Sequence, residues 1–206
     1  RIKPVIHKVF PAAQAAEDRY APNGDMNILY TASGKGPLVV MIHGYPDFSG
    51  TWDELTPMLN GAYRVVAIDT RGYNLSDKPV GPENYEMPKL IADVDAVIRA
   101  EGYDKATVLG HDWGASQAWM FAFTYPQRVE NLIILSVPHP AQFMQQMRTN
   151  PAQQASSQYA RNFQKEGSEK TMTAEGLANW VRDPAKKAKY IEAFERLTEI
   201  AFEEYL

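Results

Sequence analysis

Residues 107–115 read Thr-Val-Leu-Gly-His-Asp-Trp-Gly-Ala, and this stretch decides the fold that the sequence predicts. Its first three residues are apolar or β-branched, which is typical of the end of a buried strand, and a good helical stretch follows as far as Tyr125. Glycines lie two positions to either side of Asp112, as expected for a turn too tight for side chains. The pattern indicates a nucleophile elbow, a strand-to-helix turn that lifts its central residue above the sheet.

The residue that this turn lifts is an aspartate, whereas the motif usually carries a serine. A carboxylate in that position attacks an alkyl carbon and forms an ester, which water must then open. That chemistry suits epoxides and alkyl halides better than amides. Asp112 is therefore the candidate nucleophile, although glycines beside an acidic residue often mark an ordinary turn.

Two segments upstream strengthen the interpretation. Residues 39–42 form an apolar run that leads into His-Gly-Tyr-Pro at 43–46. Residues 64–69 form another strand, closed by the loop at 70–79. The turn at 43–46, the strand and loop at 64–79 and the motif around Asp112 occur in this order, which makes a chance match to the motif a poor explanation.

Together the three segments resemble the α/β-hydrolase superfamily and, within it, the epoxide hydrolases and dehalogenases that use an aspartate nucleophile. The carrying residues are His-Gly-Tyr-Pro at 43–46, Asp-Thr-Arg-Gly-Tyr-Asn-Leu-Ser-Asp at 69–77 and Gly-His-Asp-Trp-Gly-Ala at 110–115. Most relatives carry glycine where Asn74 stands, and asparagine tolerates left-handed backbone better than other side chains do. The resemblance implies an α/β fold with a mostly parallel sheet, helices on both faces, and a helical cap over the nucleophile.

Composition agrees with one domain and a small lid. The 206 residues are 45% hydrophobic, enough for a sizeable core, and the net charge of −4 favours neither nucleic acid nor an anionic membrane as a partner. The absence of cysteine excludes disulfides and thiolate chemistry. The four histidines lack ligand spacing, so we expect no metal and no cofactor. Without an apolar run of about 20 residues or a visible leader, the default expectation is a cytoplasmic protein.

The alternation of short β-rich runs with helical stretches predicts a parallel sheet. The strands are expected at 27–32, 38–42, 64–69, 106–110 and 131–137, and the helices at 50–60, 87–101 and 114–125. Beyond Pro140 the β-branched runs stop, and four helical stretches follow with breaks near 150–151, 167–168 and 183–184. We therefore expect the N-terminal part of an α/β-hydrolase core at 1–140 and a helical cap at 141–206.

The resemblance also implies two more strands after the cap, bearing an acid and then a histidine as base. No histidine follows His139 in this sequence. We expect the C-terminal part of the core to be absent from these residues and the cap to be incomplete. A second chain or a missing C-terminal segment would then complete the core. If a base does lie within the sequence, His139 is the first suspect.

The resemblance assigns further site residues around Asp112. The backbone N–H groups of Tyr45 and Trp113 map to the oxyanion hole, and Pro46 would fix the turn so that the Tyr45 amide points inward. His43, Pro46 and His111 would line the substrate pocket, although both histidines also suit a role in holding their loops.

Opening an epoxide ring needs a proton donor, and in epoxide hydrolases two cap tyrosines share that task. Tyr159 lies four residues before a Phe-Gln pair at 163–164, which reproduces the family spacing. Residues four apart share a helix face, so Tyr159 and Phe163 would both face the nucleophile. Tyr205 is the candidate for the second tyrosine, with Tyr190 as an alternative.

Three functions remain open. An epoxide hydrolase acting on a small apolar epoxide is favoured by Trp113 and by the cap tyrosine. A haloalkane or haloacetate dehalogenase would use the same aspartate, but haloalkane relatives carry asparagine where Tyr45 stands, and haloacetate relatives carry arginine at 113. The third possibility is a non-catalytic fragment that keeps the pocket without the acid and base.

Overall fold

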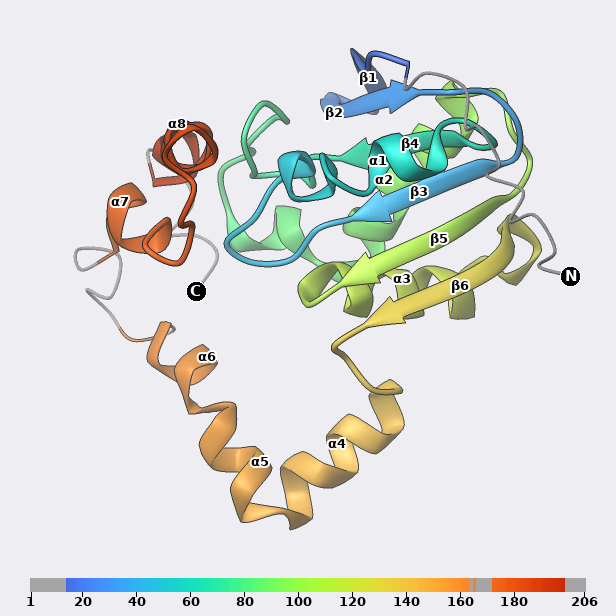
Figure 1. Ribbon diagram of the computed structural model, residues 1–206. Coiled ribbons are helices and arrows are strands. Elements are labelled where there is room, and N and C mark those ends of the chain that lie inside the picture. Colours follow the sequence, from blue (N-terminus) through green and yellow to red (C-terminus); the bar gives the residue numbers. More distant parts are fainter. Residues whose placement is uncertain (1–13, 164, 166–171, 199–206) are drawn as a thin grey trace, which may run out of the picture.

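The computed structural model describes residues 14–163, 165 and 172–198, and a six-stranded sheet lies at its centre (Figure 1). The strands are β1 (Glu17–Asn23), β2 (Met26–Ser33), β3 (Leu38–Ile42), β4 (Arg64–Ile68), β5 (Ala106–His111) and β6 (Val129–Leu135), in the order β1-β2-β4-β3-β5-β6. The last four run parallel, while β1 and β2 are antiparallel. The mostly parallel sheet is confirmed. The strand β1 was not expected from the sequence, although the two-residue loop Gly24-Asp25 that joins it to β2 is typical of a hairpin and Gly24 has a φ of 62°.

Helices cover both faces of the sheet. On one face, α2 (Met87–Ala100) and α3 (Trp113–Thr124) pack their buried residues against alternate side chains of the strands, and Phe121 is fully buried there. On the other face, the 3-10 turn η1 (Ser49–Trp52) and the short helix α1 (Thr56–Leu59) cover β3 and β4. The single helix expected at 50–60 is therefore wrong. Pro57 lies in the first turn of α1, where its missing N–H is tolerated, and so favours a new helix start.

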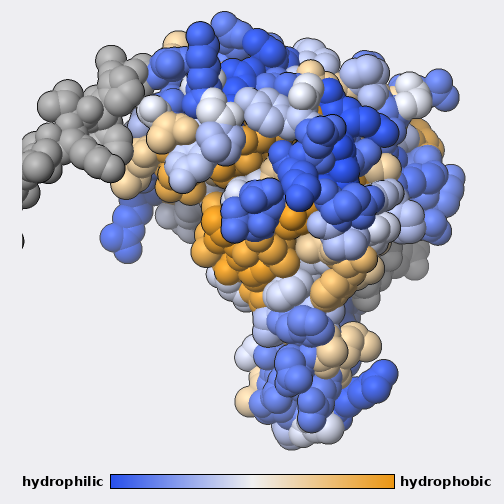
Figure 2. Space-filling model, turned by 90° about the vertical axis from the view of Figure 1, so that its right-hand side faces the viewer, coloured by the Kyte–Doolittle hydropathy of each residue, from blue (hydrophilic) through white to orange (hydrophobic). Residues whose placement is uncertain are grey.

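The β6 edge of the sheet is left partly uncovered. Leu132 and Ile134 pack toward α3, but Ile133 and Leu135, which point to the opposite face, are each 41% exposed. Phe123, near the end of α3, is also exposed. Figure 2 shows a hydrophobic area on the surface next to the arm that α4 and α5 form. Parallel strands are normally covered on both faces, so this edge is unusual.

Helices alone follow β6 in the described residues. They are α4 (Pro140–Thr149), α5 (Pro151–Ser156), α6 (Gln158–Phe163), α7 (Ala174–Leu177) and α8 (Pro184–Thr198). The breaks expected near 150–151 and 183–184 are confirmed, and a further break falls at Ser157. The break expected at 167–168 lies outside the described residues. In the part of the chain that the structure describes, no helix is long and apolar enough to cross a membrane.

The last two helices lie beyond the carboxyl ends of the strands, while α4 to α6 form an arm that curves away from β6 (Figure 1). The helix α8 packs on the segment after β3, because Tyr190 and Phe194 share a buried cluster with Phe48. Lys189 reinforces this contact with an ion pair of 2.6 Å to Asp53. The helix α8 is thus held over the end of the sheet where Asp112 lies.

Candidate active site

The turn between β5 and α3 presents Asp112 at the carboxyl end of the sheet. Asp112 has a φ of 53° and a ψ of −123°, an unusual conformation for a residue with a side chain. A Cβ at position 114 would lie 2.2 Å from the carbonyl oxygen of Ile42, and one at position 110 would lie 2.3 Å from the carbonyl oxygen of Gly114. Both glycines are therefore required by close backbone approach. The local geometry is that of the nucleophile elbow.

The turn after β3 places a hydrogen-bond donor against the carboxylate. The backbone N–H of Tyr45 donates to Oδ1 of Asp112 at 3.1 Å. Gly44 makes this approach possible, since a Cβ there would lie 2.4 Å from Cβ of Asp112. Trp113 begins α3, so its amide belongs to the unsatisfied N–H groups at the helix start, and its side chain is 54% exposed. These are the two amides that the sequence assigns to the oxyanion hole.

His43 lies beneath this turn and is 1% exposed. Its Nδ1 lies 2.8 Å from the carbonyl oxygen of Gly44, which can only accept, so Nδ1 carries the proton. Its Nε2 accepts from the backbone N–H of Thr70 at 3.1 Å. Both ring nitrogens are therefore used within the fold, and the ring packs edge-on against Tyr73. This arrangement favours a role in holding the turn over a place in the pocket wall.

The other two residues expected in the pocket, Pro46 and His111, are partly exposed. Pro46 follows Tyr45 through a cis peptide bond, and His111 is the last residue of β5. The residue after Pro46, Asp47, is a carboxylate that the sequence analysis missed. Burial raises the pKa of Asp47, and the nearby His43 with the hydrogen bonds from Phe48 and Thr51 only partly offsets the effect. Its position directly after the His-Gly-Tyr-Pro turn is the signal that could have identified it.

Tyr159 lies in the arm, on α6, and its side chain is about half exposed. The pKa of its hydroxyl is raised, first by partial burial and then by the negative charge of Asp112. The phenol is therefore within electrostatic reach of the candidate nucleophile. The structure does not describe the side chain of Phe163, which was expected to share this face.

Neither of the other two tyrosine candidates is described as a partly exposed residue like Tyr159. Tyr205 lies outside the described residues. Tyr190 is buried between Phe48 and Phe194, and its pKa is raised to about 12, chiefly by burial. It belongs to the packing of α8. Tyr45, not considered for its side chain, donates its hydroxyl to Sδ of Met172 at 3.3 Å and so links the turn to the cap.

His139, the suspected base, begins the arm. Its Nδ1 accepts from the backbone N–H of Ala141 at 3.2 Å and so caps α4. The ring packs against Trp119 and Phe123, with centroid separations of 5.0 and 5.5 Å. These contacts indicate a structural role where β6 passes into α4.

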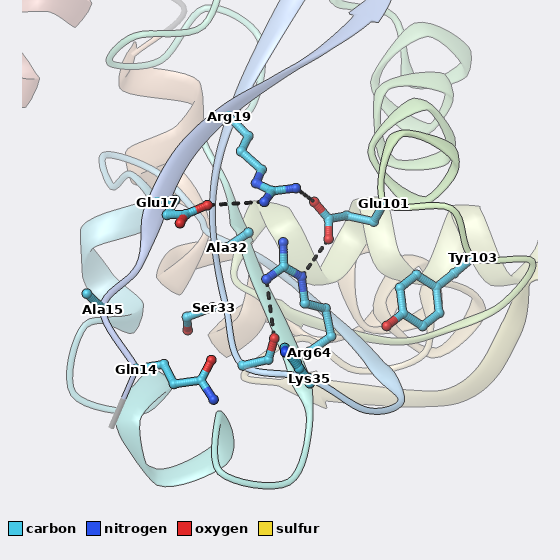
Figure 3. Close-up of a pocket in the computed structure, with 11 residues that line it drawn as sticks. Gln14, Ala15, Glu17, Arg19, Ala32, Ser33, Lys35, Arg64, Glu101 and Tyr103 are labelled. Carbon is cyan, nitrogen blue, oxygen red and sulfur yellow. Dashed lines mark hydrogen bonds and ion pairs between the residues drawn. The ribbon is translucent and has the colours of Figure 1, made fainter. Parts of the chain in front are cut away.

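A cavity of about 400 Å³ lies at the opposite end of the sheet, where β3 and β4 begin (Figure 3). Arg64 and Arg19 both approach Glu101 there, at 2.6 and 3.4 Å. Burial by itself would raise the pKa of Glu101, but hydrogen bonds from Arg64 and Tyr30 and the arginine charges outweigh it, so the pKa is lowered. These charges join β1, β4 and α2, and they lie far along the strands from Asp112.

The comparisons with known proteins agree with this geometry. The chain belongs to the alpha/beta hydrolase fold family, whose sequence profile matches residues 37–176. It is 43% identical to "Epoxide hydrolase 1" of Caenorhabditis elegans and 39% identical to "Epoxide hydrolase 4" of Homo sapiens, over 68% and 66% of its own length. These matches span only 35% and 38% of the two relatives.

Among solved structures, an epoxide hydrolase from Bacillus megaterium in complex with an inhibitor superposes with a TM-score of 0.82 at 36% identity. That match covers 91% of this chain and 72% of the other. The α/β-hydrolase fold expected from the sequence is thereby confirmed, and the similar proteins are epoxide hydrolases.

Proposed function

We propose that this chain opens small apolar epoxides and yields vicinal diols through a covalent ester on Asp112. The observation that carries the proposal is the hydrogen bond from the Tyr45 amide to Oδ1 of Asp112 at the strained elbow. It fixes one carboxylate oxygen and leaves Oδ2 to attack. The names of the similar relatives supply the class of substrate.

In the first step, Oδ2 forms a bond to an epoxide carbon while the bond from that carbon to the ring oxygen breaks. The ring oxygen takes a proton from the hydroxyl of Tyr159 and becomes the alcohol of an ester intermediate. The phenol of Tyr159 is protonated at neutral pH, and the upward shift of its pKa maintains this at higher pH. It is a weak acid, but a neutral donor suits a leaving oxygen that needs protonation.

In the second step, water attacks the ester carbonyl carbon and the negative charge develops on its oxygen. The amides of Tyr45 and Trp113 would hold that charge, each contributing about 3 kcal/mol. Collapse releases the diol and restores the carboxylate, and the proton left over from the water returns to the phenolate of Tyr159. One oxygen of the first diol therefore comes from Asp112 rather than from the solvent.

Ester hydrolysis also needs a base, and His43 and His139 both serve the fold. We assign the base to protein that covers the β6 edge, either a further segment or a second chain. Ile133 and Leu135 give that protein an apolar surface to cover. Residues 1–206 expressed alone should then form at most one equivalent of product. Repeated turnovers by a monodisperse sample would contradict this assignment and make His139 the first candidate for the base.

The experiment that tests the function is mass spectrometry of the chain after exposure to a small aryl epoxide. We expect a mass increase equal to the epoxide, located on Asp112 and absent from the Asp112→Asn variant. With the base present, a single turnover in heavy-oxygen water should give a first diol that holds only light oxygen. Heavy label in that first diol would mean direct attack by water and would overturn the ester mechanism. Faster reaction with an alkyl halide than with the epoxide would indicate a dehalogenase.

A further inference from the structure

Asn74 connects a cap helix to the loop that holds the candidate nucleophile. We propose that Asn74 is a positioning residue that couples the seating of α8 to the alignment of Asp112. The catalytic consequence of this coupling rests on the proposed function.

The backbone at this position does not require an asparagine. Asn74 has a φ of 42°, in the left-handed region that glycine adopts most readily. The residue is nonetheless 7% exposed, and both ends of its side-chain amide are used. Nδ2 donates to Oδ2 of Asp69 at 2.8 Å, and Oδ1 accepts from Nη1 of Arg196 at 2.7 Å. The side chain thus bridges a buried anion and a cation on α8.

Asp69 links Asn74 to the loop after β3. Its carboxylate follows β4 and is fully buried, and its Oδ1 accepts from the backbone N–H of Ser49 at 2.7 Å. Ser49 begins η1, four residues after Tyr45, whose amide holds Asp112. A continuous path therefore runs from Arg196 through Asn74 and Asp69 to the loop that binds the nucleophile.

The charges fix the direction of the bridging amide. Its oxygen faces the Arg196 cation and its nitrogen faces the Asp69 anion, so each hydrogen bond polarises the amide in the sense that strengthens the other. Without Asn74, Asp69 would lose a close donor while buried, a costly state for a carboxylate. The Asn74 side chain therefore stabilises one position of α8 and, at the same time, one position of the loop that contains Ser49.

A second set of contacts joins α8 to the same loop. Tyr190 packs edge-on against Phe48 with a centroid separation of 5.0 Å, and Lys189 pairs with Asp53. The loop is therefore held by α8 at Phe48 and, through Asn74 and Asp69, at Ser49. A shift of α8 must move or strain the loop between these points.

Amide hydrogen exchange at Ser49 in the full chain tests the coupling without requiring turnover. Asn74→Gly removes the bridge and suits the left-handed backbone, and Arg196→Gln removes its far end without touching Asp69. We expect each substitution to speed exchange at Ser49 by about 10-fold, as for the loss of a hydrogen bond to a charged group. The double variant should exchange no faster than Asn74→Gly. Glu192→Gln is the matched control, because it removes the other partner of Arg196 and leaves Asn74 in place.

Unchanged exchange at Ser49 in Arg196→Gln, or a double variant whose effect is the product of the two single effects, overturns the proposal. If Asn74→Gly fails to fold, exchange at Ser49 in Arg196→Gln compared with Glu192→Gln still tests the coupling. The rate of ester formation on Asp112 is the second readout, and we expect it to fall about 10-fold in both bridge variants and not in the control. A wild-type chain that forms no ester overturns the proposed function, while the exchange result still judges the coupling.

Discussion

Two carboxylates at opposite ends of the parallel sheet, Glu101 and Asp112, are held by different kinds of partner. At the end where the strands begin, Glu101 lies between two arginines and a tyrosine, and its pKa is lowered. At the carboxyl end, burial raises the pKa of Asp47, and Asp112 is held by a backbone amide. Cations neutralise Glu101, whereas a neutral N–H group of the backbone holds Asp112.

The difference distinguishes a structural carboxylate from a reactive one. A carboxylate fully occupied by guanidinium groups has no oxygen left for a substrate, and its charge is already balanced. A carboxylate held on one oxygen by an N–H keeps the other oxygen available for attack. We therefore expect Glu101 to be a structural carboxylate and Asp112 to be a reactive one.

Asp112→Asn should have the largest effect. The amide is nearly the same size and tolerates the left-handed backbone, but it cannot act as the nucleophile, so ester formation should fall by about 10⁴-fold or more. Adduct mass spectrometry measures the rate, and thermal unfolding should show a fold close to that of the wild type. Rapid adduct formation by this variant would place the nucleophile elsewhere.

Glu101→Gln should instead destabilise the fold by about 2 kcal/mol and leave ester formation on Asp112 unchanged. Because the folded pKa of Glu101 is lowered below its ordinary 4.5, its stabilisation is present above about pH 4.5 and is lost as the pH falls through the folded value. Denaturant unfolding at pH 7 and at pH 3 should show the gap between wild type and variant closing at the lower pH. A slower adduct rate in this variant would show that the two ends are coupled.

Tyr159→Phe should slow ester formation by about 10-fold or more, because the substitution removes the proton donor. In the wild type the rate should stay level through neutral pH and fall as the pH rises beyond 10, where the phenol loses its proton. Stopped-flow kinetics with the epoxide measure both effects. A rate unaffected by the substitution would remove Tyr159 from the mechanism.

Asp47→Asn should have the smallest effect and the opposite sign to Glu101→Gln. The folded pKa of Asp47 is raised above its ordinary 3.8, so its ionisation weakens the fold progressively as the pH rises from about 3.8 through the folded value. The variant lacks that loss and should gain less than about 1 kcal/mol over the wild type at pH 7, with no gain at pH 3. A variant that is markedly less stable at pH 7 would mean that the charge of Asp47 is paired after all.

Local sequence patterns predicted the parts of the molecule that depend on nearby residues. The parallel strands, the turn at Asp112 and the His-Gly-Tyr-Pro turn could all be recognised, because spacing along the chain determines them. The split of the helix at 50–60 was missed, although Pro57 favours a new helix start within that stretch. The strand β1 was missed as well, because its exposed residues lack the alternation of a half-buried strand.

Contacts between distant residues could not be predicted. The bridge from Asn74 to Arg196 spans 122 residues, and no local pattern relates the two positions. The hydrogen bond at Nε2 of His43 comes from Thr70, which follows β4, whereas His43 follows β3. The raised pKa of Asp47 likewise depends on how the chain folds around it.

The backbone conformation of Asp112 implies a conflict between the thermal stability of the protein and the proposed reactivity of this residue. A φ of 53° with a ψ of −123° is disfavoured for any residue with a side chain, at a cost of about 1–3 kcal/mol. Only a packed neighbourhood that includes the close approach of Gly44 can keep an aspartate there. Asp112→Gly should accordingly yield a more heat-resistant protein that is inert toward electrophiles. Selection for thermostability alone would therefore tend to discard the residue on which the proposed activity depends.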